Sequence, residues 1–136
     1  MTSSLPLDRV IASYAWNEHK VCINPSLYFF HQGKKDHAKI FVAAYTNPDT
    51  GDVRWYASSN VEYGTGGGSA LPSCNTQFRE RPGHETMPAA ALAEITALLE
   101  REVGSWCCHL SPTAIELLTL EQHRLSGRIG VQGSLF

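Results

Sequence analysis

The clearest local structural signal of this chain is the segment HAKIFVAAYTNPDTGDVRWYASSN, residues 37–60. Two runs rich in β-branched and aromatic residues flank the sequence NPDTGD, whose proline, aspartates and glycine favour a reversal of the chain. This pattern is typical of two antiparallel strands joined by a short turn. The segment therefore predicts a β-hairpin with strands near 38–45 and 53–59.

Helical patterns occur on both sides of the hairpin. Residues 6–18 carry apolar side chains at helical spacing, after serines that can cap a helix. The segment PAAALAEITALLEREV, 88–103, begins with a proline suited to the first helical turn and is rich in strong helix formers. In SPTAIELLTLEQHRL, 111–125, a serine in the cap position precedes a proline. We expect helices over these three segments.

The other segments have weaker patterns. KVCINPSLYFF, 20–30, predicts one or two short extended pieces, interrupted where its proline prevents a continuous ladder. GSWCCHL, 104–110, predicts a short buried strand, and the tail 126–136 an edge strand or a frayed end. Between 60 and 87 the apolar residues follow neither the helical nor the strand period, which predicts a long loop. Such a long loop in a compact domain is usually functional or disordered.

The expected order of elements is helix, one or two strands, hairpin, long loop, helix, strand, helix. This order predicts a mixed α/β domain of the α+β kind, with a single-layer central sheet that contains the antiparallel hairpin and is packed by about three helices. A chain of 136 residues suits one hydrophobic core. We therefore expect a single domain over residues 1–136.

Composition excludes several classes of protein. A hydrophobic content of 43% with 18% charged residues is typical of a globular chain rather than a disordered one. The formal net charge of −2 and the lack of a basic block argue against a duplex nucleic-acid footprint, although a pocket for a single base stays open. No apolar run reaches the length of a membrane span, and the start of the chain lacks the pattern of a signal peptide. We expect a cytoplasmic protein with reduced thiols, or one exported by a route that needs no signal peptide.

Three short motifs resemble the cytidine deaminase superfamily of zinc-dependent enzymes. ASSNVEYGTGG follows the second hairpin strand, as an Asn-Val-Glu segment does in cytidine deaminases. LAEITALLE is similar to their Ala-Glu helix, and LSPTAIELL stands where their Ser-Pro-Cys-x-x-Cys helix begins. The resemblance, over about residues 6–125, implies a deaminase-like order of elements and a pocket for cytosine, a nucleoside or a nucleic-acid base. It makes Glu94 the catalytic proton carrier and Asn60 and Glu62 ligand-binding candidates.

The zinc site of that superfamily is not retained at the matching positions. One histidine or cysteine and two cysteines bind the zinc there, and the corresponding residues of this chain are Leu92, Thr113 and Glu116. Leucine cannot bind zinc, and a zinc site needs at least three protein donors. The resemblance therefore implies a degenerate deaminase-like domain in which zinc is a cofactor only if other residues supply the ligands.

The glycine-rich segment GTGGGSALPSCNTQFRERPGH, 64–84, contains a second set of candidates. Its Cys74 and His84 form the minimum for a thiol-dependent amide hydrolase, in which a histidine activates the cysteine. The combination is similar to bacterial toxin-type glutamine deamidases. The same two residues are also candidate zinc ligands that would replace Leu92. The alternative is a surface cysteine and a solvated histidine in a flexible loop.

A third set of candidate metal ligands lies in the expected strand 104–110. Alternate residues of a strand share a face, so Cys107 and His109 can converge on one ion, joined by His84, His31 or His37. The alternative is that these residues belong to the core, where cysteine behaves as a small hydrophobic residue.

Two classes of function follow from these patterns. One is a small hydrolytic or deaminating domain of the kind found at the catalytic end of a bacterial effector or toxin. The other is a binding protein without catalysis, such as an immunity or adaptor protein, that takes a small molecule, a single base or a protein partner. In either class, Trp55 or its neighbour would face away from the core and stack on a planar ligand.

Overall fold

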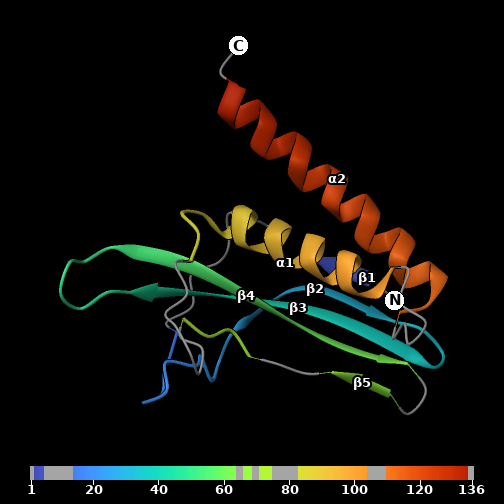
Figure 1. Ribbon diagram of the computed structural model, residues 1–136, viewed down its shortest axis with the longest axis horizontal. Coiled ribbons are helices and arrows are strands. Elements are labelled where there is room, and N and C mark those ends of the chain that lie inside the picture. Colours follow the sequence, from blue (N-terminus) through green and yellow to red (C-terminus); the bar gives the residue numbers. More distant parts are fainter. Residues whose placement is uncertain are drawn as a thin grey trace.

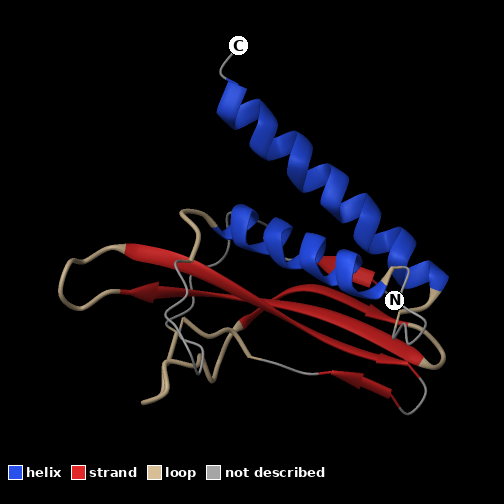
Figure 2. Cartoon of the chain, in the orientation of Figure 1, coloured by secondary structure: helices blue, strands red, loops and turns tan. Residues whose placement is uncertain are grey.

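One antiparallel sheet and two helices make up the part of the chain that the computed structural model describes, which is residues 2–4, 14–63, 66–68, 71–74, 83–103 and 110–134. The elements are β1 (Thr2–Ser4), β2 (Ser26–Gln32), β3 (Asp36–Thr46), β4 (Val53–Tyr63), β5 (Gly66–Gly68), α1 (Met87–Glu102) and α2 (Pro112–Ser134). The strands follow the order β1-β2-β3-β4-β5 in the sheet. Both helices lie on the same side of the sheet (Figure 1; Figure 2). The predicted fold class is confirmed, with two described helices in place of about three.

The predicted hairpin is the centre of the sheet. β3 and β4 pair over their whole length, from Asp36 opposite Tyr63 to Thr46 opposite Val53. In the turn between them, the Asn47 side chain accepts hydrogen bonds from two following backbone N–H groups, as asparagine commonly does in turns. The hairpin prediction is confirmed, and both strands are longer than the sequence pattern indicated.

Helix α1 covers the hairpin. The β3 residues that point toward the helices are apolar and fully buried, and so are the inner residues of α1. Thr86 caps the helix by accepting a hydrogen bond from the N–H of Ala89 at 3.2 Å. The core so formed includes Ala38, Ile40, Val42, Ala91, Ile95 and Leu98. The helix predicted over 88–103 is therefore confirmed.

Helix α2 begins where its cap predicts and ends later than expected. The Ser111 hydroxyl accepts from the N–H of Ala114 at 3.1 Å and donates to the Asp36 carboxylate at 2.6 Å, which joins the helix to β3. The helix then continues to Ser134, so the expectation of an edge strand or frayed end for 126–136 was wrong up to that residue. A tail without proline can extend an existing helix with one more hydrogen bond per residue, whereas a strand needs a neighbour.

The helix expected over 6–18 is wrong for the residues that the structure describes. Positions 14–18 are not helical, and Trp16 forms a β-bridge with Cys22. The Trp16 ring contacts Tyr45 and Tyr56 edge to face, and its N–H donates to the Ala44 carbonyl. These contacts with the hairpin outweigh the local helical spacing. Residues 6–13 lie outside the described part, while β1, which the sequence did not predict, pairs with β2.

The segment after residue 60 contains more pairing than its sequence indicated. β4 continues to Tyr63, and the three glycines of β5 pair with its last residues. Further along, Ser73 forms a bridge with Val21, and His84 forms one with Trp55. Backbone groups make all of this pairing, so it cannot be predicted from a periodic pattern of apolar side chains. The strand expected over 104–110 lies outside the described residues, apart from its last residue, which is buried.

Candidate functional site

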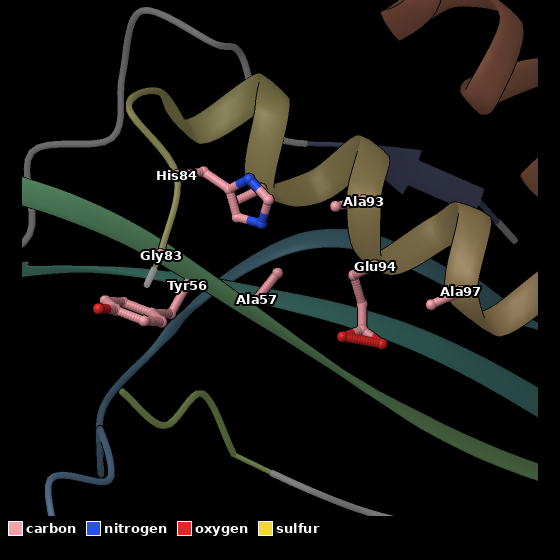
Figure 3. Close-up of a pocket in the computed structure, with 8 residues that line it drawn as sticks. Tyr56, Ala57, Gly83, His84, Ala93, Glu94 and Ala97 are labelled. Atoms are coloured by element: carbon pink, nitrogen blue, oxygen red, sulfur yellow. The ribbon is translucent and has the colours of Figure 1, made fainter. Parts of the chain in front are cut away.

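A cavity of about 150 Å³ lies between α1 and β4. It is the meeting point of three segments: one face of α1, the middle of β4, and the two residues at the end of the glycine-rich segment (Figure 3). Its lining consists of Tyr56, Ala57, Gly83, His84, Ala90, Ala93, Glu94 and Ala97.

Three alanines of α1 form one wall of this cavity. Ala90, Ala93 and Ala97 recur at the spacing that places side chains on one helical face. Each presents only a methyl group, so the wall is low and leaves space beside the longer side chain of Glu94. Ala90 is buried and Ala97 is exposed, so this wall runs from the core to the surface of the helix.

Glu94 supplies the acidic group of the cavity. Its side chain extends from α1 toward the strands (Figure 3), and its carboxylate accepts a hydrogen bond from the Ser59 hydroxyl at 3.3 Å. Ser59 can reach it because alternate β4 residues, among them Ala57 and Val61, face the helices. The described lining residues include no lysine or arginine. Among the described lining residues, His84 is the one other histidine, aspartate or glutamate, and four alanines supply methyl groups.

His84 closes one end of the cavity. Two backbone hydrogen bonds with Trp55, of 2.7 and 2.9 Å, hold it against the edge of β4. The preceding residue, Gly83, has a φ of 71°, and a Cβ atom there would lie 2.7 Å from the ring of Tyr56. Only glycine allows this conformation and this close approach. The His84 ring lies beside the first turns of α1 (Figure 3).

The structure brings two of the three catalytic candidates together and leaves out the third. Glu94 and His84 line the same cavity, but Cys74 is not among its lining residues. Cys74 is 3% exposed, and its thiol lies 3.6 Å from the carbonyl oxygen of Lys20, to which its backbone N–H also donates. The cysteine therefore belongs to the pairing between residues 20–22 and 72–74, away from the cavity lining.

The three predicted ligand-binding residues do not line the cavity. Trp55 packs against the core and meets Tyr14 edge to face, whereas its neighbour Tyr56 reaches the cavity. Asn60 and Glu62 are on alternate positions from the residues that face the helices. Glu62 lines a second depression at the turn between β2 and β3, where its carboxylate lies 4.0 Å from His37.

The described residues do not fit the zinc site that the deaminase resemblance implies. Among them, no group of three or more histidine, cysteine, aspartate or glutamate side chains is placed to hold a metal ion. Leu92, at the first ligand position, packs against the core. Of the proposed metal ligands, His84 and Cys74 are described and stand apart as above, and Cys107 and His109 lie outside the described residues.

The carboxylate of Glu121, on α2, has different hydrogen-bond partners from that of Glu94. Glu121 of α2 accepts a hydrogen bond from the hydroxyl of buried Tyr28 at 2.6 Å and is bound by the guanidinium of Arg124. Burial raises the pKa of Glu121, but the hydrogen bonds from Arg124 and Tyr28 and the charge of Arg124 outweigh burial, so the pKa lies below its ordinary value. The hydrogen bond between Glu121 and Tyr28 therefore connects α2 to β2.

Sequence reasoning found Glu94 and His84 but missed most of the wall. The alanines of PAAALAEITA recur at one helical spacing, which was a usable sign of a helix face with room beside it. Tyr56 and Gly83 had no such sign, because their roles come from the pairing of His84 with β4.

In the described part of the chain, no helix is both long and apolar enough to span a membrane.

Comparison with known proteins returns no relative. No protein-family model, curated protein or solved structure matches this chain. The residues of the cavity are therefore the basis for a functional assignment.

Proposed function

We propose that this chain is a binding protein whose cavity between α1 and β4 receives one small planar group of a ligand or of a partner protein. The observation that carries the proposal is a cavity of about 150 Å³ whose lining combines the carboxylate of Glu94 and the imidazole of His84 with alanine methyl groups and a tyrosine. Pockets for whole drug-sized ligands measure roughly 300–1,000 Å³. A cavity of about 150 Å³ holds a group the size of benzene.

The lining selects for a group that donates hydrogen bonds. The carboxylate of Glu94 only accepts hydrogen bonds when it is ionised, and the Ser59 hydroxyl is one of its donors. The apolar wall favours a flat group that leaves little polar surface against it. We propose on this basis a binding role of the immunity or adaptor type, which needs no catalytic group.

Nuclear magnetic resonance titration of the labelled protein tests this proposal. Cytosine, phenol and methylguanidinium serve as planar probes. At least one of them should shift the backbone amide signals of Ala57, Glu94 and Ala97. Ala93→Leu should abolish the shifts, because leucine fills the space beside Glu94. Glu100→Leu is the matched control, since it adds the same side chain on the exposed surface of α1. Shifts at these amides from none of the probes, or equal shifts in Ala93→Leu, would contradict the proposal.

Deamination is a second candidate function, because Glu94, the residue that matches the proton carrier of the deaminase motif, does line the cavity. Ammonia release from cytosine and cytidine tests it, with Glu94→Gln as the inactive control and metal analysis of the same samples. Activity that Glu94→Gln removes would favour an enzyme over a binding protein. Thiol-dependent amide hydrolysis gains no support, since Cys74 lies outside the cavity that His84 lines.

A further inference from the structure

We infer that the face of the sheet turned away from the helices binds single-stranded nucleic acid, with the rings of Phe30 and Phe41 stacking on unpaired bases. Both helices lie on one side of the sheet (Figure 1), and this surface is formed by β2 and β3 on the other side. It shares no residue with the lining of the cavity between α1 and β4. The inference therefore goes beyond the proposed function and does not depend on it.

The pairing of β2 with β3 places both rings on this face. Ile40 of β3 belongs to the core under the helices, so its neighbours Lys39 and Phe41 face the other way. Phe30 is paired with Lys39, and directly opposed residues of two strands share a face. Phe30 and Phe41 are therefore diagonal neighbours, at positions that are roughly 7–8 Å apart in such a sheet. Each ring is partly exposed and can take a base of its own.

The surroundings of the two rings are apolar and basic. Leu27, opposite Phe41, is 37% exposed. The ammonium nitrogen of Lys39 lies 5.7 Å from the centre of the Phe30 ring. On the β4 side of Phe41, Ser58 is only 4% exposed, so the surface ends there. Aromatic rings beside a cation, on an exposed sheet face, are the arrangement on which unpaired bases stack without regard to their sequence.

Lysines gather at one end of this surface. The chain has four lysines, and three of them, Lys34, Lys35 and Lys39, lie in the turn between β2 and β3 or in the adjoining part of β3. Lys34 and Lys35 are exposed and line a depression of about 290 Å³ at this turn. The phosphates of a strand whose bases lie on the rings would pass this end, where ammonium groups attract them.

The acidic residues of the depression do not cancel this charge. Glu62 is exposed, and its carboxylate lies 4.0 Å from the His37 ring. Asp36 also lines the depression, but its side chain is 7% exposed and its carboxylate accepts a hydrogen bond from the Ser111 hydroxyl at 2.6 Å. Among the described residues of this end, three lysines face one exposed carboxylate. The net positive charge favours an anionic partner.

The combination of lysines and flat rings favours a single strand over other anions. An acidic peptide meets the same positive charge but has no series of flat bases for the rings. A duplex holds its bases stacked between its two strands, so they cannot lie on a sheet face. A single strand presents both phosphates and unpaired bases.

Fluorescence anisotropy of a labelled oligothymidylate of about ten nucleotides tests the inference on the purified full chain. The matched control ligand is an oligomer of the same length made of abasic sites, which keeps the phosphates and lacks the bases. We expect the oligothymidylate to bind at least about 10-fold more tightly, because stacking of one base contributes about 5-fold or more. Phe30→Leu and Phe41→Leu, which keep an apolar side chain but remove the ring, should each weaken binding about 5-fold.

The lysines are tested through the dependence of binding on salt. Lys35→Gln should weaken binding and make the plot of log affinity against log salt shallower by about 0.7, the contribution of one phosphate contact with a single strand. Arg101→Gln is the matched control, since it removes the same charge from an exposed position of α1, on the helix side of the sheet. It should change neither the affinity nor the salt dependence.

Equal affinity for the abasic oligomer would overturn the inference, because charge alone would then explain binding. Tighter binding of polyglutamate than of oligothymidylate would also overturn it, in favour of an acidic protein partner. So would failure of the oligothymidylate to bind, or unchanged affinity in both leucine variants. Denaturant unfolding checks that these variants are folded, and the comparison of ligands on the unmodified chain does not depend on them. None of these results bears on the cavity between α1 and β4, which its own probes test.

Discussion

The two helices each send a glutamate side chain toward the sheet, and the two carboxylates lie in contrasting surroundings. Glu121 of α2 is bound by the Tyr28 hydroxyl and by the guanidinium of Arg124 from the same helix. Glu94 of α1 accepts a longer hydrogen bond from Ser59 and lines a cavity. In one region the chain provides its own arginine, and in the other the described lining provides none.

This difference separates a carboxylate that attaches α2 to β2 from a carboxylate that lines a cavity. Glu121 is already surrounded by donors of the protein, and its charged state contributes to the attachment of α2. Glu94 lies beside space that alanines and a crowded glycine keep open.

The largest expected effect concerns the wall of the cavity. Gly83 and Gly51 both have left-handed backbone conformations, but only at Gly83 would a Cβ atom meet neighbours, among them the Tyr56 ring at 2.7 Å. Gly51→Ala should lower the free energy of unfolding by about 1 kcal/mol through backbone strain. Gly83→Ala should cost about 3 kcal/mol, because crowding adds to the same strain. Denaturant unfolding measures both, and equal costs would show that Tyr56 can move aside and that the cavity wall is not rigid.

The two sheet hydroxyls should differ by a smaller amount. Tyr28→Phe removes a buried hydrogen bond of 2.6 Å to a charged group and should cost about 2 kcal/mol of unfolding free energy. Ser59→Ala removes a hydrogen bond of 3.3 Å beside a cavity and should cost only about 0.5 kcal/mol. Thermal and denaturant unfolding of both variants compare them. If Ser59→Ala were as costly as Tyr28→Phe, Glu94 would be a structural group like Glu121.

The smallest expected effect is a dependence of stability on pH. The pKa of Glu121 is lower in the folded state than its ordinary value of 4.5, so the charged carboxylate stabilises the fold above that pH. This contribution is lost as the pH falls from about 4.5 through the lower pKa of the folded state. Unfolding curves between about pH 6 and 2 should show a shallower acid loss for Glu121→Gln than for the wild type. Glu100→Gln, on the exposed surface of α1, should follow the wild-type curve, and an unchanged slope in Glu121→Gln would refute the assignment.

The sequence predicted well where structure is set by neighbouring residues. The hairpin of β3 and β4 follows from its turn residues and β-branched runs, and α1 follows from its cap and helix formers. Prediction failed for 14–18, where a helical spacing exists but the aromatic rings of Tyr14 and Trp16 instead pack on the hairpin. Helix propensity contributes about tenths of a kcal/mol per residue, and the tertiary contacts of these rings exceed it.

The hairpin, both helix starts and the position of Glu94 within a helix could be predicted from the sequence alone. Each of these depends on residues close together in the chain, whose spacing can be recognised without the rest of the fold. Three features depend on contacts between distant segments: His84 pairs with Trp55 at the edge of β4, Cys74 pairs with Lys20 and not with His84, and Tyr56 lines the cavity. Backbone hydrogen bonds between distant segments bring these residues into place, and such bonds leave no side-chain pattern from which the site could be predicted.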